Sequence, residues 1–207
     1  MKQALKVYSI DGVTPVVDPT AFVHPSAVLI GDVIVGPGVY VGPCASLRGD
    51  FGRLVIREGA NIQDCCIVHG FPDADTVIGR NGHIGHGAII HGAVIGDNAL
   101  IGMNAVINDY AEIGESAVVA ALAFVKAQDK VPPRSLAAGI PARVLRELTK
   151  AELDWKAGGT RLYQNLTLRS LKTMRACAPL IKERAKRKRF NLPEVLPLSV
   201  LKKKSPR

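Results

Sequence analysis

Long hydrophobic runs, disulfide-forming cysteine patterns and aromatic residues are all scarce in this sequence of 207 residues. The first residues contain no apolar segment of the kind found in a signal peptide, and no stretch is long enough for a membrane-spanning helix. The four cysteines form neither a disulfide framework nor a zinc-type Cys-x-x-Cys motif, and the adjacent Cys65 and Cys66 are typical of reduced thiols. We therefore expect a cytoplasmic protein with no membrane partner. No cysteine stands in a recognisable nucleophile motif.

Acidic residues are nearly absent from the last part of the chain. Residues 172–207 contain twelve Lys or Arg and two Glu, so this stretch carries a charge of +10 while the rest of the chain carries −1. Such a run is typical of a solvated, flexible tail; the functional alternative is attraction of a polyanion, such as the phosphates of coenzyme A, nucleic acid or an acidic partner. The run does not indicate a DNA-binding fold, so nucleic acid is not an expected partner.

A six-residue period is the strongest feature that the sequence does contain. Aliphatic residues recur at every sixth position, and the frame is shifted by one insertion of three residues, one of four and a deletion of one residue. No helical or period-two pattern competes with this repeat. Hexapeptide repeats of this kind predict a parallel β-helix, in which three short strands form one triangular coil around an aliphatic axis. The axial residues are predicted to be Val23, Leu29, Val35, Val41, Leu47, Ile56, Ile62, Val68, Ile78, Ile84, Ile90, Ile95, Ile101, Ile107, Ile113, Val119 and Val125.

Four of the five histidines fall between residues 69 and 91. The position after the axial aliphatic is usually Gly, but one column of neighbouring coils carries Arg48, His69, His91 and Asn108 instead. Neighbouring coils lie ~4.8 Å apart, so the imidazoles of His69 and His91 can share one metal ion. His86 lies on the next face. It can reach that ion only from a neighbouring subunit, if the coils pack around a threefold axis.

The other histidines have simpler interpretations. A single His in a β-helix is more often a hydrogen-bonded turn residue than a ligand, and we interpret His24, in the first coil, and His83, which faces elsewhere in its hexad, as structural residues. Two histidines in register with a third one face away favour a metal site instead.

Several motifs together resemble the γ-class carbonic anhydrases and their left-handed β-helix relatives: Arg48-Gly49-Asp50, Asn61-Ile62-Gln63-Asp64, His69, and Gly85-His86 through His91-Gly92. The resemblance covers about residues 16–146 and is closest to the branch linked to phenylacetate degradation and the carnitine operon. It implies a left-handed β-helix and a homotrimer with zinc at each subunit interface, held by His69, His86 and His91. Iron and cobalt also suit imidazole ligands.

The resemblance also assigns roles around the metal. It implies that Gln63 hydrogen-bonds the attacking water or the developing oxyanion, with assistance from Asn61, and that Tyr163 enters the site from a C-terminal helix. It further implies that Arg48, Asp50 and Asp64 form an ion-pair network at the interface; they could equally orient the metal ligands.

One departure from the γ-class pattern bears on the reaction. Phe51 follows Asp50 where the archaeal prototype has a glutamate, and the loop after His69 is short. We interpret Asp73 and Asp75 as turn residues of this loop; the alternative is that one of them carries protons. Efficient CO2 hydration needs proton export, so we predict a zinc-dependent hydrolase acting on acyl-CoA thioesters in aromatic-acid catabolism. The alternatives are a γ-class carbonic anhydrase and a non-catalytic trimeric scaffold. Hexapeptide acyltransferases share the coil but do not require three histidines.

The expected organisation has three parts: a β-helix over residues 1–135, a helical segment over 136–179 and a basic tail over 180–207. A capping box formed by Thr149 and Glu152 predicts a helix that begins there and runs through Trp155. The pair Gly158 and Gly159 is expected to interrupt it. A second helix is predicted over residues 161–177.

Overall fold

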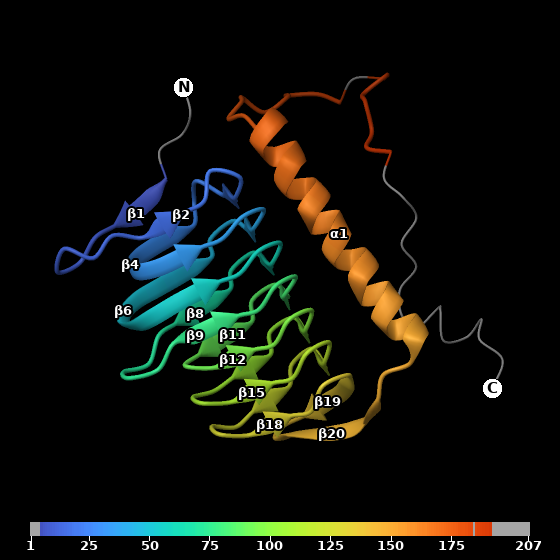
Figure 1. Cartoon of the computed structure of the whole chain (residues 1–207). Coiled ribbons are helices and arrows are strands. Elements are labelled where there is room, and N and C mark those ends of the chain that lie inside the picture. Colours follow the sequence, from blue (N-terminus) through green and yellow to red (C-terminus); the bar gives the residue numbers. More distant parts are fainter. Residues whose placement is uncertain (1–4, 184, 192–207) are drawn as a thin grey trace.

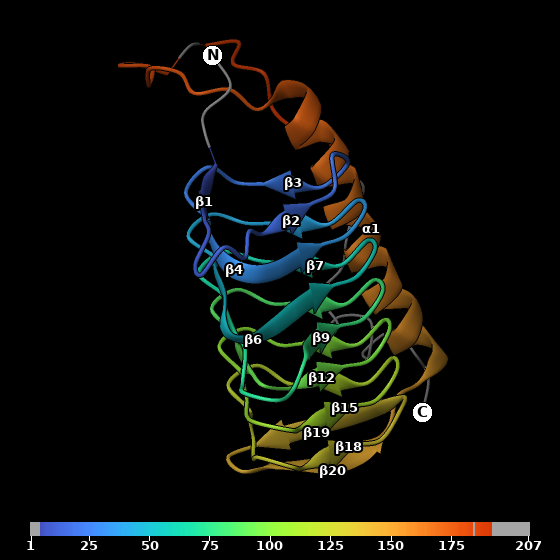
Figure 2. The same cartoon turned by 60° about the vertical axis from the view of Figure 1, so that its left-hand side comes forward.

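The computed structural model describes residues 5–183 and 185–191, and its strands stack as the coils of a solenoid with one helix along the side (Figures 1 and 2). The first face consists of β1 (Lys6–Tyr8), β8 (Ile67–His69), β11 (Ile89–His91), β14 (Val106–Ile107) and β17 (Phe124–Val125); the second of β2 (Val16–Val17), β9 (Thr76–Ile78), β12 (Val94–Ile95), β15 (Glu112–Ile113) and β18 (Lys130–Val131). Strands β4 (Val28–Val35) and β6 (Ser46–Ile56) pair with both faces. The third face consists of β3 (Phe22–Val23), β5 (Tyr40–Val41), β7 (Asn61–Ile62), β10 (His83–Ile84), β13 (Leu100–Ile101), β16 (Val118–Val119), β19 (Ser135–Gly139) and β20 (Ala142–Glu147).

The aliphatic residues of the six-residue period fill the axis of this solenoid. Leu47, Ile62, Ile84 and Ile101 are all fully buried, and the rest of the predicted column lies in the same cluster. Pairing between successive coils is parallel throughout, apart from the antiparallel hairpin of β19 and β20 that ends the stack. The predicted fold, a left-handed parallel β-helix of hexapeptide repeats, is confirmed.

The corners of the coils are tight turns in which one residue has a left-handed backbone. Asn98 and Asn104 have φ values of 57° and 55° at two such corners. Asn tolerates this conformation because its short polar side chain can bond locally. The turns therefore repeat from coil to coil and keep the faces in register.

A single helix, α1 (Lys150–Thr173), follows the hairpin and runs back along the third face towards the first coils (Figures 1 and 2). The predicted capping box of Thr149 and Glu152 is present. The predicted break at Gly158 and Gly159 is wrong, because the helix is continuous and ends at Thr173 rather than near Cys177. A glycine costs a helix only ~1 kcal/mol, and the packing of α1 on the face offsets that cost.

Polar side chains hold α1 in place. Lys156 is buried and its Nζ donates to the Asn81 carbonyl and to Asn98 Oδ1, both at 2.7 Å. The carboxylate of Glu152 receives two hydrogen bonds from the Arg146 guanidinium at the end of the stack. Both contacts lie just before the glycine pair, so they fix the helix next to the point where its own sequence is weakest.

Within the described residues, no helix is both long and apolar enough to cross a membrane. The predicted basic tail falls largely outside the described residues, since residues 184 and 192–207 are not among them. Its predicted role stays a prediction.

Candidate metal centre

The imidazoles of His69 and His91 face one another across neighbouring coils. Strands β8 and β11 pair with His69 opposite His91, and Arg48 of β6 stands opposite His69 on the other side, as the predicted column requires. His69 Nδ1 lies 3.0 Å from His91 Nε2, and the ring centroids are 5.0 Å apart. The sequence prediction that these two side chains come together is confirmed.

The outward nitrogen of each ring is held by a carboxylate. Asp50 Oδ1 lies 3.1 Å from His69 Nε2, and the other oxygen of Asp50 accepts from Arg48 Nη1 at 2.7 Å. The carboxylate of Asp109 is hydrogen-bonded to His91 Nδ1. Such outer carboxylates fix the tautomer and orientation of metal-binding imidazoles, so Asp50 acts here on the ring of His69 within one chain.

This hydrogen bonding creates a local conflict that a cation would remove. If each outward nitrogen carries its proton towards a carboxylate, then His69 Nδ1 and His91 Nε2 point lone pairs at each other across 3.0 Å. A shared proton or a metal ion between them is needed. Two nitrogens bound to one tetrahedral zinc, each ~2.0–2.1 Å from it, lie ~3.3–3.4 Å apart, so the pair fits zinc after a shift of a few tenths of an ångström.

The surroundings of the pair also suit a neutral ligand. Burial, followed by the charge of Arg48, lowers the pKa of His69 from its ordinary value, so the imidazole stays unprotonated near neutral pH. Phe51 stacks obliquely on His69 with centroids 5.3 Å apart, and Phe71 meets His91 edge-on at 6.0 Å. Two aromatic rings therefore flank the two nitrogen donors.

Asp109 was not among the residues predicted from the sequence. It lies on the coil after His91, opposite Gly92 in the register set by β11 and β14. Gly92 has φ 56°, and a Cβ there would come within 3.1 Å of Asp109 Oδ1. The glycine that ends the Gly85–Gly92 motif is thus the signal, because it leaves the space through which the carboxylate reaches His91.

His86 occupies a separate corner, at the other end of the face formed by β11. Its Nδ1 lies 3.1 Å from Asp64 Oδ2, and its Nε2 lies 3.4 Å from the hydroxyl of Tyr163 on α1. Burial, followed by the charge of Asp64, raises the pKa of Tyr163 to about 12, so the phenol keeps its proton. His86 and His91 are five residues apart along an extended edge, roughly 15 Å, and cannot share an ion within one chain.

Gln63 and Asn61 lie under α1 beside this second corner, and both are buried. The two hydrogens of the Gln63 amide nitrogen are directed at Asn61 Oδ1, 2.9 Å away, and at His83 Nε2, 2.7 Å away. The amide oxygen is the part of Gln63 left to act. Gln63 can therefore accept a hydrogen bond from an attacking water, whereas its implied alternative, donation to an oxyanion, lacks a hydrogen.

His83 was interpreted as structural, and the structure gives that role a specific content. Burial, followed by the charge of Lys156, lowers the pKa of His83 to about 3, so Nε2 accepts from Gln63 at any ordinary pH. The proton then sits on Nδ1, which lies 3.4 Å from Thr160 Oγ1 and 3.3 Å from Asn61 Nδ2, and the hydroxyl oxygen is the acceptor of the two. His83 holds the orientation of the Gln63 amide, and no spacing in the sequence revealed this contact.

The four cysteines form no disulfide. All four are free, as the sequence predicted, and Cys66 is buried, which raises the pKa of its thiol to about 11. In the described part of one chain, no three His, Cys, Asp or Glu side chains are grouped so that they could hold a metal ion. The candidate ligands are thus divided between two corners, with two imidazoles at one and a single imidazole at the other.

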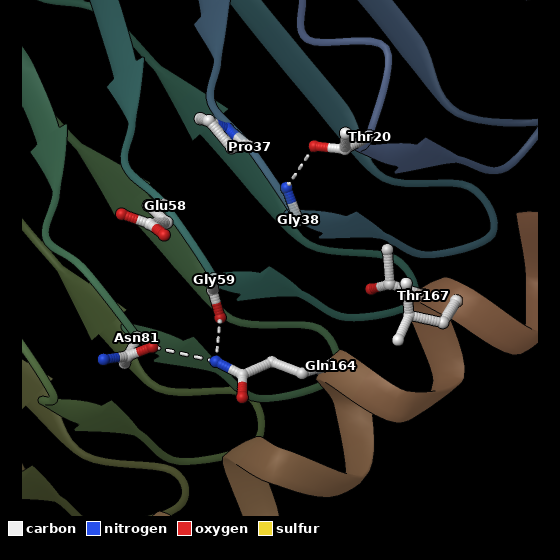
Figure 3. A pocket seen from close by; sticks show the side chains of 9 residues that line it. Thr20, Pro37, Gly38, Glu58, Gly59, Asn81, Gln164 and Thr167 are labelled. Carbon is white, nitrogen blue, oxygen red and sulfur yellow. Dashed lines mark hydrogen bonds between the residues drawn. The ribbon is translucent and has the colours of Figure 1, made fainter.

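A pocket on the side of α1 away from His86 and Gln63 contains none of the predicted site residues (Figure 3). There, Gln164 Nε2 donates to Asn81 Oδ1 at 2.8 Å and to the Gly59 carbonyl at 3.3 Å, and Thr20 accepts from the Gly38 amide (Figure 3). The bonds of Gln164 attach the helix to the coils, and the residues that line the pocket include Glu58 but no histidine or cysteine.

The coil and its repeats define a hexapeptide-repeat protein. The model of the family described as "Bacterial transferase hexapeptide (six repeats)" matches residues 92–127. Carnitine operon protein CaiE from Escherichia coli is 56% identical over 176 residues, which cover 85% of this chain and 90% of CaiE. The chain therefore belongs to the hexapeptide-repeat family that contains CaiE and the γ-carbonic-anhydrase-like proteins.

Two solved structures are similar over most of their length. A putative acetyltransferase from Bacillus cereus is 32% identical, with a TM-score of 0.79 over 80% of this chain and 96% of that one. A hexapeptide transferase family protein from Anaplasma phagocytophilum is 36% identical, with a TM-score of 0.75 over 81% of this chain and 98% of that one. Both agree with the β-helix described above.

Proposed function

We propose that the protein is a homotrimer that binds one zinc ion at each subunit interface, or iron or cobalt in its place, and hydrolyses acyl-CoA thioesters. His69 and His91 of one subunit and His86 of the next would hold the ion. One observation carries the proposal: each of these three imidazoles has an aspartate against its outward nitrogen, namely Asp50, Asp109 and Asp64. Three such pairs are the arrangement expected of metal-binding histidines rather than of turn residues.

When bound, such an ion supplies a Lewis acid with one open position, at which water ionises near pH ~7. The chain's own residues orient the reactants. The oxygen of Gln63 accepts a hydrogen bond from the attacking water and directs its lone pair at the thioester carbon, while Tyr163 donates to the carbonyl oxygen. A carbon–oxygen bond forms, the carbon–sulfur bond breaks, and the proton lost by water ends on the thiolate, giving a carboxylic acid and free CoA thiol.

The surroundings of the histidine pair favour a thioester over CO2 as the substrate. Phe51, which stands where the γ-class prototype has a glutamate, packs on His69 and supplies no carboxylate for proton export. Asp73 lies in a left-handed turn of the loop closed by Phe71 and Ala74, which supports its turn role. The name of one solved relative, a putative acetyltransferase, also refers to transfer of an acyl group.

The metabolic setting is a finer part of the proposal. The sequence resembles the phenylacetate-degradation protein PaaY, which suggests aromatic acyl groups, whereas the relative that is 56% identical belongs by name to a carnitine operon. A panel that contains both phenylacetyl-CoA and carnitine-related acyl-CoA esters distinguishes these settings.

Metal analysis, a CoA-thioester panel and a CO2-hydration assay on one preparation test the proposal. We expect about one metal ion per chain and release of free thiol that depends on it. Full thioesterase activity in metal-free protein would exclude the metal from the reaction. CO2 hydration without thioester hydrolysis would establish a carbonic anhydrase. Acyl transfer to an added amine or hydroxyl would establish a transferase, and a metal-free trimer that is inactive in every assay would establish a scaffold.

A further inference from the structure

We infer that a cleft between α1 and the third face binds the apolar acyl chain of the substrate, with the chain running from His86 towards the hairpin of β19 and β20. The position given to the carbonyl group, near His86, rests on the proposed function. The position given to the alkyl chain rests on the shape and lining of the cleft. The class of substrate it assigns is an acyl-CoA with a medium-length aliphatic chain, such as octanoyl-CoA.

The cleft has a volume of about 470 Å³, within the range of ~300–1,000 Å³ typical of small-molecule sites. Its lining is divided by chemistry. One end is formed by Gln63, His83, His86 and Tyr163, the polar groups of the second histidine corner. The other end is formed mainly by aliphatic side chains and by Trp155 of α1. An acyl group whose carbonyl lies at the polar end would therefore place its alkyl chain at the apolar end.

The apolar floor follows from a change in one column of the third face. Residues in register on successive coils are Asn61 and His83, then Leu100, Val118 and Leu136. The first two are polar and bond to Gln63, whereas the next three are aliphatic and only half-buried although they lie under a helix. Three coil steps separate the coil of His83 and His86 from that of Leu136, ~14 Å at ~4.8 Å each, which leaves room for an extended chain of medium length.

The wall of the cleft opposite Leu100, Val118 and Leu136 is formed by α1 and the residue Leu148 before it, and the contacts of the helix show why it does not pack directly on these three side chains. Leu148 and Trp155 line the cleft, while the buried groups that attach this part of the helix are polar and bond elsewhere. Glu152 is bonded to Arg146, and Lys156 to Asn81 and Asn98. The helix is held by its polar contacts at a distance from the aliphatic column, and Met103, 54% exposed, lies at the rim.

Trp155 is the single tryptophan of the chain, so its emission reports directly on the cleft. Full-length protein carrying His69→Ala and His91→Ala, which removes two proposed metal ligands and prevents turnover, is titrated with CoA, acetyl-CoA, butyryl-CoA and octanoyl-CoA. The emission should respond to octanoyl-CoA and not to CoA. The dissociation constant should fall up to about fourfold per added methylene, which corresponds to ~0.8 kcal/mol of burial for each. A constant independent of chain length would overturn the inference.

Two cleft variants and one matched control locate the chain. Val118→Phe fills the floor and Val118→Thr makes it polar at nearly the same volume, so a misfolded Phe variant leaves the Thr variant as the test. Each should weaken octanoyl-CoA binding at least tenfold and leave CoA binding unchanged. Leu168→Phe, at the pocket on the other side of α1, should change neither. If Val118→Thr binds octanoyl-CoA as wild type does, the chain lies elsewhere.

The same titration separates this inference from the proposed hydrolysis. Chain-length-dependent binding in the histidine variant, with no thioester hydrolysis by metal-loaded wild type, would keep the acyl cleft and reject the hydrolase. Metal-dependent hydrolysis with equal rates and affinities for acetyl-CoA and octanoyl-CoA would keep the hydrolase and reject the cleft.

Discussion

The two histidine corners of this solenoid are built to different degrees. At the first, strand register alone brings His69 Nδ1 and His91 Nε2 within 3.0 Å of one another, beside the rings of two phenylalanines. At the second, His86 has one carboxylate and one phenol nearby, and its side chain is 45% exposed. The coil can pair residues above and below one another but cannot bring its own corners together, so a third imidazole at the pair has to come from another subunit.

The largest effect is expected from breaking the paired corner. His69→Ala should reduce the bound metal from about one ion per chain to none, with complete loss of the proposed hydrolysis, because one imidazole remains where two are needed. Elemental analysis of the purified variant measures this directly. The matched control is His24→Ala, a half-buried histidine whose Nδ1 contacts Ser26, which should keep the metal.

At the second corner, Gln63→Ala should keep the metal and lower kcat by roughly ten- to a hundredfold with little change in KM. The reason is loss of one hydrogen bond to the attacking water, worth ~1.5–3 kcal/mol when the partner becomes charged. Steady-state kinetics with any accepted thioester measures it. Wild-type kinetics in this variant would remove Gln63 from the reaction.

A change at Asp109 tests whether the hydrogen bond between this carboxylate and His91 matters for metal binding. Asp109→Asn should weaken metal binding by roughly 10–100-fold, because the outer partner fixes the imidazole and raises its basicity. Competition with a chelator of known affinity gives the constant. Asp129→Asn, which disturbs only a surface pair with Lys126, serves as the control, and equal affinities for the two variants would contradict the role of Asp109.

Mixing two inactive variants tests whether the corners meet between subunits. If His86→Ala and His91→Ala chains are co-expressed in equal amounts, an interface is intact when an intact His69–His91 pair faces an intact His86. This happens with a chance of ~1/2 × 1/2, so about a quarter of wild-type activity should return. Mixed trimers that form and remain inactive would refute the shared site.

The last effect concerns the buried His83 beside Gln63, and it develops only at acid pH. Burial lowers its pKa from 6.5 to about 3, so the unfolded chain takes up a proton that the folded chain refuses. Stability should therefore be fully present above about 6.5 and fall as the pH drops towards 3. Denaturant unfolding at several pH values should show this slope in wild type and a shallower one in His83→Gln. Parallel slopes would assign the acid sensitivity to other groups.

The sequence predicted the face and register of each site residue better than it predicted side-chain contacts. The six-residue period determines which residues stack, so the pairing of His69 with His91 followed from counting. Asp109 was missed because its contact passes through the space left by Gly92, and the bonds of His83 depend on how α1 lies on the third face. The break predicted at Gly158 and Gly159 was wrong for the same reason, since local propensity was overridden by contacts distant in sequence.

The position of α1 also affects how the solenoid comes apart. In a stack of repeats each coil touches only its neighbours, so unfolding can start at an end and proceed one coil at a time. The 24 residues of α1 extend ~36 Å, several coil heights, and are bonded near the hairpin through Glu152, one turn later through Lys156 and further up through Gln164. Loss of the last coil would remove the bonds from Arg146 to Glu152 and so release one end of a helix that is also bonded to coils further up the stack. The helix thus couples the ends of a nearest-neighbour array and makes its melting more nearly all-or-none.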